Sequence, residues 1–470
     1  MEEEKPPSIS GIDRKTNCNR DCSAEQTDLS RSVFMSTSRR RFLRSSTLAA
    51  AAVSVAPLAA ADKPAPPARS APPAPSDDPR MLYYDQFYFK EKPVFRFEYP
   101  FDGGVLQEGT GYPILGTETG ADGVKRLRIH VVVRPGDVGN LQVFDPEGAV
   151  IPMEPISGAL MGPALLKDRL SILKARGTKN GKPVEFTCRV LWAKNAYKRY
   201  RCYIDDHSFC FRDILQKQYK SIFDCFYFAK LRELHKRYQT KIVLNCFNST
   251  PERDFTLSMF PEKYKPEFED NADWLRLAFH SENEFPGEPY RNAAPEKLAA
   301  DFDLTATQLK RIAGKAYTAG LQIHFAMVRA DSYQVLADRG VKMLPTGGSK
   351  HPGTGDKYCD FMLPNHITAY LREHQGWMDP DSGIIFYNGV MPTTCEWIPT
   401  TQTEWLHHRK LDNPKQNLLI NIAGHEQYWW PFYRNYKADI FERWDTALRH
   451  VTEHGYKPIW IDDGFFGGCD

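Results

Sequence analysis

The spacing of apolar residues divides the chain into an alternating part and a later part in which strand-like and helix-like patterns take turns. Up to about residue 196, apolar positions recur at every second residue, as in 94–99 and 126–133, and clusters of Gly, Pro and Asp separate these runs. Short alternating runs with frequent turns are typical of antiparallel sheets. We therefore predict a small all-β sandwich over residues 81–197, with a packing or spacer role.

Beyond this part, short apolar runs alternate with amphipathic segments. Residues 200–206, 241–247 and 275–280 indicate strands, and apolar residues at helical spacing predict a helix over 221–238. Alternating strands and helices over this length predict a parallel sheet closed into a (β/α) barrel, which we place at residues 198–470. The remaining predictions are strands at 321–327, 341–344, 417–423 and 458–461, helices at 295–317, 332–339 and 437–454, and loops or a hairpin over the barrel mouth at 346–395.

The N-terminal stretch has no folding pattern and resembles an export signal. Residues 38–43 read Ser-Arg-Arg-Arg-Phe-Leu, which matches the twin-arginine motif, and an Ala-rich apolar stretch continues to Ala61. We predict that residues 1–61 are a leader and signal peptide with Met35 as the working start, and that 62–80 form a Pro/Ala-rich linker. The expected partner is the twin-arginine export machinery, and the expected destination is the periplasm or the extracellular space.

Composition narrows the possible partners. The 61 basic and 59 acidic residues give a net charge of +2, which provides no reason to expect nucleic acid or an acidic membrane surface as a partner. No run is long enough for a transmembrane helix, so we expect no stable membrane span. Because the twin-arginine route carries proteins that have folded in the reducing cytoplasm, we expect buried free thiols at the cysteines of the apolar runs. These are Cys202, Cys210, Cys225 and Cys246.

Three of the apolar runs end in residues that can bind a metal or transfer a proton. The run at 200–206 ends in Asp205 and Asp206, a second ends in His280, and a third ends in His425. Barrels of this kind carry their chemistry at the carboxyl ends of the strands, so these side chains are expected to converge. Adjacent residues of a strand point to different sides, so one carboxylate can bind a metal while the other faces the substrate.

Asp206, His280 and Glu284 can form a metal site of one histidine and two carboxylates. His280 and Glu284 are four residues apart, so one helical turn after the strand would place them on the same side. Glu282 is the alternative third ligand if the segment stays extended. One divalent ion is expected; the donor set suits zinc, iron, cobalt or manganese, and zinc is our first choice.

The remaining two residues supply proton transfer for the hydrolysis of an amide or ester. A metal in this site would activate water toward a carbonyl carbon. Asp205 would take the proton from that water, and His425 would protonate the leaving group. Glu426, the residue after His425, is a candidate partner for its imidazole.

These motifs resemble those of the polysaccharide deacetylase (carbohydrate esterase) family. The resemblance rests on Tyr-Ile-Asp-Asp at 203–206, on Phe-His-Ser-x-x-Glu at 279–284, and on the late His425. It covers about residues 198–466 and implies a distorted (β/α) barrel with fewer than eight strands, acting as a metal-dependent deacetylase of a polysaccharide. The family's general base corresponds to Asp205.

The same resemblance assigns a ligand role to two further residues and shows where the chain departs from the family. The second Asp of the family motif, a metal ligand, corresponds to Asp206, and the first His of its His-Ser/Thr-x-x-His motif corresponds to His280. Glu284 stands where the family has the second His. An Arg-Pro motif is not recognisable, with Arg329 as a loose candidate, and His425 follows Ile-Ala-Gly. The chain therefore resembles a divergent branch.

Two other functions are compatible with the sequence. A glycoside hydrolase would use paired carboxylates without a metal, but His280 and His425 would then have no role. A carbohydrate-binding protein that has lost activity is the non-enzyme alternative. It stays open because Glu284 stands where the deacetylase family has a metal-binding histidine. The aromatic residues Trp274, Tyr428 and Trp429 are predicted to bind substrate, or else to pack the barrel. His324 lies inside a predicted strand and is interpreted as a core histidine.

Overall fold

The computed structural model describes residues 94–111, 113–346, 360–389, 395–397 and 417–469. The predicted leader, the signal peptide, the Met35 start and the linker lie outside these residues. In the part of the chain that is described, no helix is both long and apolar enough to cross a membrane.

The alternating N-terminal part of the chain contributes strands to two sheets that share one core. In β4, Leu127, Ile129, Val131 and Val133 are buried on one side, and they pack with residues of β8 and β9 such as Leu173. One sheet has the order β1-β4-β7-β6, with β3 paired to β4. The strands of this part are β1 (Arg96–Tyr99), β2 (Gly104–Gln107), β3 (Ile114–Thr119), β4 (Lys125–Arg134), β5 (Gly139–Phe144), β6 (Glu154–Ile156), β7 (Ala159–Leu166), β8 (Leu170–Lys179) and β9 (Lys182–Ala193).

The second sheet contains strands from a distant part of the sequence. It is seven-stranded, with the order β13-β15-β14-β2-β9-β8-β5. The hairpin of β14 (Gly376–Met378) and β15 (Ile385–Tyr387) lies in the segment that we predicted to form loops or a hairpin. Its Trp377 pairs with Gly104 of β2 and donates from Nε1 to the carbonyl of Asp102 over 2.9 Å. Strand β13 (Met343–Pro345) completes the sheet beside β15.

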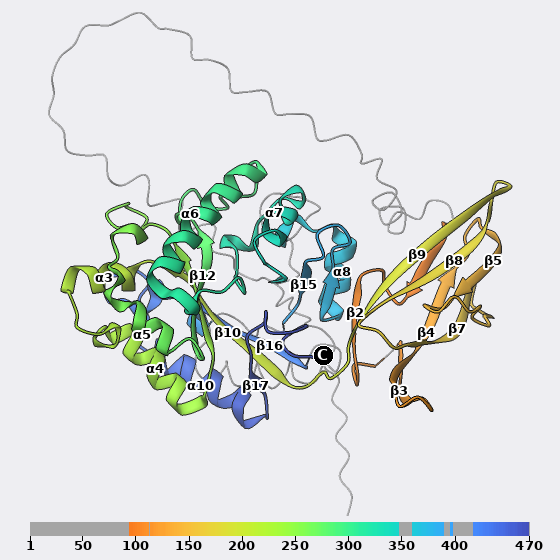
Figure 1. Cartoon of the computed structure of the whole chain (residues 1–470), viewed down its shortest axis with the longest axis horizontal. Helices are drawn as coiled ribbons and strands as arrows, with labels where there is room; N and C mark the ends of the chain where they lie inside the picture. Colours follow the sequence, from red (N-terminus) through yellow and green to blue (C-terminus); the bar gives the residue numbers. More distant parts are fainter. Residues whose placement is uncertain (1–93, 112, 347–359, 390–394, 398–416, 470) are drawn as a thin grey trace, which may run out of the picture. The chain divides into compact units, whose positions relative to one another are not determined.

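The later part of the chain contains the predicted parallel sheet (Figure 1). Its order is β12-β11-β10-β16, with β17 paired to the start of β10. These pairings are all parallel, so the carboxyl ends of the strands lie at one edge. The strands are β10 (Arg199–His207), β11 (Ile242–Phe247), β12 (Leu275–Ser281), β16 (Leu419–His425) and β17 (Lys457–Pro458).

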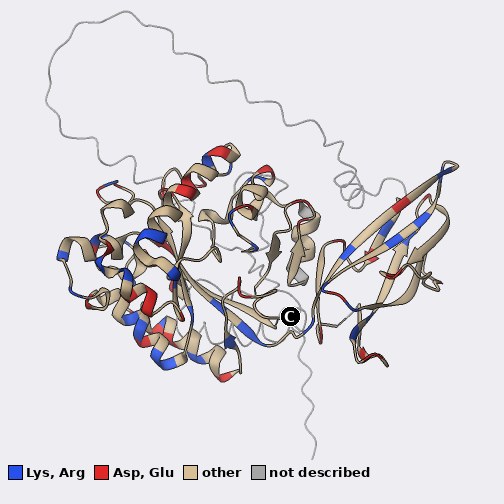
Figure 2. Cartoon of the chain, viewed as in Figure 1, with Lys and Arg blue, Asp and Glu red and all other residues tan. Residues whose placement is uncertain are grey.

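Amphipathic helices cover the parallel sheet. Helix α4 buries Tyr227, Phe228, Leu231 and Leu234, which recur at helical spacing. It lies beside α10, where Asp445 accepts from Arg237 over 2.7 Å, and basic and acidic residues are mixed along both helices (Figure 2). The α-helices are α3 (Phe209–Lys217), α4 (Phe226–Tyr238), α5 (Lys265–Asp270), α6 (Pro295–Ala313), α7 (Tyr333–Ala337), α8 (Asn365–Glu373) and α10 (Ile440–Glu453).

Two predicted strands differ in the structure. The segment 321–327 forms no strand; it contains the 3-10 turn η6 (His324–Ala326), in which Phe325 has a φ of 60°. The predicted strand at 458–461 is reduced to the short β17. The strand pairing of the described residues does not run around a closed ring, and the distorted (β/α) barrel stays a prediction.

The cysteine prediction is confirmed for the residues that the structure describes. Cys202, Cys210, Cys225 and Cys246 are buried and free, and Cys188, Cys395 and Cys469 are as well. Burial raises the pKa of the four predicted thiols, as for Cys202, whose pKa reaches about 12. Buried protonated thiols of this kind are poor nucleophiles, so they contribute packing rather than chemistry.

Candidate metal centre

Strand β10 ends in the two adjacent carboxylates, and the strand is irregular at this point. Asp206 has a φ of 68°, a left-handed conformation that Asp tolerates better than most residues. The pairing of β10 with β11 shifts register between Ile204 and His207. Regular alternation is therefore interrupted, and both carboxylates lie near His280. We expected strand alternation to point the two side chains to different sides, and the structure corrects this expectation. The two carboxylates differ instead in their hydrogen-bond partners.

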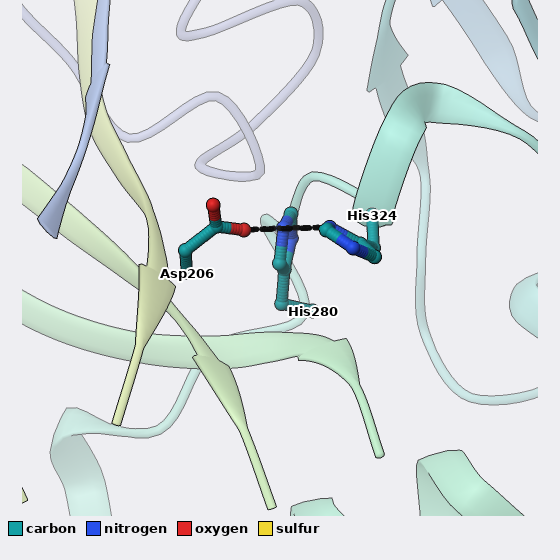
Figure 3. A group of neighbouring side chains, drawn as sticks. All are labelled: Asp206, His280 and His324. Carbon is teal, nitrogen blue, oxygen red and sulfur yellow. Dashed lines mark hydrogen bonds and ion pairs between the residues drawn. The ribbon is translucent and has the colours of Figure 1, made fainter. Parts of the chain in front are cut away.

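Asp206, His280 and His324 bring three possible ligand atoms together (Figure 3). Oδ1 of Asp206 lies 3.1 Å from Nε2 of His280 and 3.3 Å from Nδ1 of His324. The two nitrogens are 3.1 Å from each other. All three residues are buried, and their ligand atoms lie within 4.8 Å of one another. This group could hold a metal ion.

The outer nitrogen of each histidine is held by a backbone carbonyl. His280 Nδ1 lies 2.6 Å from the carbonyl oxygen of Gln322, and His324 Nε2 lies 3.2 Å from that of Glu284. A carbonyl can only accept, so the outer nitrogens carry hydrogens. The inner nitrogens donate to Asp206 when they are protonated, and in the neutral rings they would present lone pairs to a cation beside Asp206. Lone pairs that converge in this way fit a bound cation, and metal-binding histidines commonly have such outer contacts.

The charges of the centre suit a cation as well. Burial raises the pKa of Asp206, but the hydrogen bonds from His280 and His324 outweigh burial and hold the pKa well below its usual range. Burial lowers the pKa of His280, but Asp205 and Asp206 together raise it above the usual value. Asp206 is therefore ionised at neutral pH, and its carboxylate offers a negative charge to a cation.

Asn245 of β11 holds the other carboxylate, Asp205. Its Nδ2 donates to Asp205 Oδ1 over 2.7 Å, and its Oδ1 accepts from the backbone N–H of Gln322 over 3.0 Å. Because the carbonyl of Gln322 accepts from His280, a chain of hydrogen bonds links Asp205 to the metal centre. Burial raises the pKa of Asp205, and His280 and His425 partly offset this effect. A partly exposed carboxylate with a raised pKa is suited to accept a proton.

His425 lies across from Asp205, since the two are register partners in the pairing of β10 with β16. Its Nδ1 contacts Oε1 of Glu396, a buried carboxylate in the 3-10 turn η9 (Cys395–Trp397). Burial lowers the pKa of His425, but Glu396 outweighs burial, and the pKa rises to about 10. His425 is therefore an imidazolium at neutral pH and can donate a proton from Nε2, the nitrogen that does not contact Glu396.

Glu426 does not partner His425 as expected. Its carboxylate accepts from the backbone N–H groups of Ser208, Phe209 and Cys210, at 2.8, 2.9 and 2.5 Å. It also accepts from Trp430 Nε1 over 3.2 Å. A carboxylate at this position caps the first turn of α3, which directly follows β10. Glu426 therefore fixes the chain after Asp206, and Glu396 takes the role that we predicted for Glu426.

The predicted third ligand, Glu284, is replaced by His324. No helical turn follows β12, so the side-chain spacing on which the Glu284 prediction depended is absent. Among the described residues, the ligand group contains His324, and Glu284 contributes its backbone carbonyl to that histidine. The alternative ligand Glu282 instead accepts from Arg253 over 2.9 Å. His324 was interpreted as a core histidine because the segment 321–327 has the pattern of a strand.

The predicted aromatic residues are not all near the centre. Trp274 is buried at the start of β12, where it stacks on His235 with ring centroids 4.6 Å apart. His280 lies about 20 Å further along an extended strand, so the structure separates Trp274 from the site. Tyr428 is buried with its ring centroid 6.1 Å from that of His425. Trp429 packs against Tyr227 and is part of the core.

Comparisons with known proteins give no family for the chain. No protein-family model matches it, and no curated protein does. Similar solved structures include a modular endo-β-1,4-mannanase from Cellulomonas fimi, 19% identical over 22% of this chain and 18% of that chain, with a TM-score of 0.14. A β-glucuronidase of Parabacteroides merdae is 10% identical over 70% of this chain and 47% of that chain, with a TM-score of 0.17. β-Glucuronidase 2 of Bacteroides uniformis is 9% identical over 72% of this chain and 50% of that chain, with a TM-score of 0.22.

The chain spans half or less of the length of each of these three structures. TM-scores this low do not establish a shared fold. The geometry of the candidate centre and the sequence motifs therefore carry the functional argument.

Proposed function

We propose that this protein is a metal-dependent hydrolase that removes acetyl groups from a polysaccharide, by amide or ester hydrolysis. The observation that carries the proposal is the buried group of Asp206, His280 and His324 beside the pair of Asp205 and His425. The polysaccharide substrate is supported by the resemblance of the sequence motifs to the polysaccharide deacetylase family.

The residues of the centre fit one divalent cation. Two imidazole nitrogens and a carboxylate oxygen would hold it, and their outer contacts already orient the rings. This donor set suits zinc, iron, cobalt or manganese. Zinc is our first choice, since catalytic zinc sites have three protein ligands of these types and an open position.

A bound cation of this kind supplies Lewis-acid polarisation of the acyl carbonyl and lowers the pKa of water. Asp205, held by Asn245 through Oδ1, would take the proton from the attacking water through Oδ2. His425, held in the charged form by Glu396, then gives a proton to the leaving amine or alkoxide. The two residues are register partners on neighbouring strands, so base and acid are fixed relative to each other.

The first test is metal content. Purified protein should contain about one zinc, iron, cobalt or manganese ion per chain, and His280→Ala and His324→Ala should each lose it. His130→Ala, in β4 of the sandwich, is the matched control and should keep the ion. Normal metal content in both His280→Ala and His324→Ala would refute the centre.

The second test separates the base from the ligand. Asp205→Asn should retain the metal and the fold, while the release of acetate from acetylated glycans falls about a hundredfold or more, the usual size of a general-base effect. Asp206→Asn should lose the metal. If Asp205→Asn loses metal and Asp206→Asn keeps it, the two roles are reversed. Metal-free protein that cleaves glycosidic bonds would support the glycoside hydrolase alternative instead.

A further inference from the structure

Gln427 connects the end of β16 to Asp206. It lies in the 3-10 turn η10 (Glu426–Trp429), directly after β16, and its side chain is buried. Its Nε2 donates to Oδ2 of Asp206 over 2.9 Å. The other oxygen of the same carboxylate, Oδ1, is the one that faces His280 and His324. The two oxygens of Asp206 therefore have separate partners.

The position of Gln427 is fixed by its neighbour. Glu426 accepts from three successive backbone N–H groups at the start of α3, so η10 is tied to the chain that follows Asp206. The turn that carries Gln427 and the strand end that carries Asp206 are thus held together by contacts that do not involve the Gln427 amide.

The orientation of the amide is fixed by its chemistry. An ionised carboxylate can only accept, so the Gln427 nitrogen must be the atom that faces Asp206. Within the described residues, Gln427 Oε1 is buried without a hydrogen-bond donor. A buried amide oxygen without a donor costs free energy. The fold keeps the hydrogen bond from Gln427 Nε2 to Asp206 in spite of this cost.

We infer that Gln427 is a positioning residue for the metal: it occupies Oδ2 of Asp206, so that Asp206 binds a divalent cation through Oδ1 alone. A carboxylate that uses one oxygen takes a single coordination position and leaves the others open for water and substrate. This inference rests on the proposed metal centre, and it adds a residue that determines how one ligand binds.

The experiment uses the full chain and measures metal binding rather than turnover. Gln427→Leu and Gln427→Met remove the donor and keep a side chain of similar size. Both should weaken Zn²⁺ binding about tenfold or more in competition with a chelating dye, the usual effect of removing a contact to a metal ligand. With Co²⁺ in place of Zn²⁺, both variants should also change the visible absorption spectrum, because Asp206 can then bind through two oxygens.

The matched control is Gln322→Leu. Gln322 is also buried, and it contacts the site through its backbone: its carbonyl faces His280 and its N–H donates to Asn245. The substitution leaves these backbone contacts in place. Among the described residues, no hydrogen bond joins its side chain to Asp206, and its Oε1 has no partner. Zn²⁺ affinity should stay within about twofold of the wild type, as expected when no contact to a ligand is removed.

These measurements distinguish a failure of the positioning role of Gln427 from a failure of the proposed metal centre. If His280→Ala loses metal while both Gln427 variants keep the affinity and the Co²⁺ spectrum of the wild type, the positioning role is wrong and the metal centre stands. If His280→Ala binds metal normally, the centre itself is wrong. A crystal structure of the wild type with Co²⁺ decides the matter even if the variants do not fold. It should show one Asp206 oxygen on the ion, and two would overturn the inference.

Discussion

At the scale of single residues, the candidate site depends on which groups each side chain contacts. Asp205 and Asp206 are chemically identical and adjacent in sequence, yet one is bonded to the amide of Asn245 and the other to two histidines and Gln427. These contacts make Asp206 the carboxylate that suits a metal and Asp205 the one that suits a proton.

The pair of His425 and Glu396 leads to a prediction about pH. Since Glu396 is what raises the pKa of His425 to about 10 against the effect of burial, the acid should stay protonated well above neutrality. On the alkaline side, activity of the wild type should therefore stay constant up to this range and fall as the pH rises through it. In Glu396→Gln the pKa of His425 drops, so the alkaline limb of the profile of kcat/KM against pH should move to lower pH.

The control for this prediction is Glu282→Gln, which removes a carboxylate that pairs with Arg253 and does not contact His425. Its alkaline limb should coincide with that of the wild type. An unchanged limb in Glu396→Gln would show that His425 is not the acid or that Glu396 does not control it.

At the scale of elements, the site is assembled where parallel strands end together. β10, β12 and β16 present Asp206, His280 and His425 at one edge of the sheet because all their pairings are parallel. The turn η6 adds His324, and α3 is joined to the sheet through Glu426. The rigid sheet therefore sets the spacing of the ligands, and the segments after it complete the centre.

The hydrogen bonds between Glu426 and the start of α3 predict how the free energy of unfolding depends on pH. Burial raises the pKa of Glu426 from 4.5 to about 7 in the folded protein, although the N–H groups of 208–210 oppose this effect. The folded state then holds the proton more tightly than the unfolded state, so this group contributes its full stability below pH 4.5 and loses it as the pH rises to about 7. A shift of this size corresponds to about 3 kcal/mol.

Glu426→Gln tests the contribution of Glu426 to stability. The amide cannot accept through its nitrogen, so at pH 5 the variant should unfold about 1–3 kcal/mol more easily in urea than the wild type. The difference should shrink toward pH 7, because the glutamine does not titrate. Glu442→Gln, at an exposed position of α10, should show neither effect. A difference that grows with pH would contradict the sign of the linkage.

At the scale of the whole molecule, the sequence joins a predicted export signal to a sandwich and a parallel sheet. The hairpin β14–β15 pairs with β2, so residues far apart in sequence form one seven-stranded sheet. The sequence predicted loops or a hairpin over 346–395, but a pairing between distant segments leaves no mark on the local pattern.

The resemblance of residues 38–43 to a twin-arginine motif gives a prediction for the whole chain. Changing Arg39 and Arg40 both to Lys should leave the precursor in the cytoplasm, because the export machinery reads this arginine pair. The measurement is cell fractionation followed by detection of the protein. Changing Arg41 alone to Lys is the matched control, and this variant should be exported normally. Undiminished export of the double variant would contradict the prediction.

The sequence by itself determined the elements and part of the site. Alternating and helical spacing predicted β1, β4, β5 and β9 of the sandwich, β10 to β12, β16, α4, α6 and α10, because burial of one face leaves a periodic pattern of apolar residues. The position of a polar residue directly after a buried strand indicated Asp206, His280 and His425, since strand ends meet at one edge.

Only the tertiary structure decided the partners. His324 lies with the ligands in a 3-10 turn where Phe325 has a φ of 60°, a conformation that no glycine marks in the sequence. Glu396, Asn245 and Gln427 reach His425, Asp205 and Asp206 from other strands or turns. Hydrogen bonds between distant segments depend on how the elements pack, and for that reason local periodicity cannot contain them.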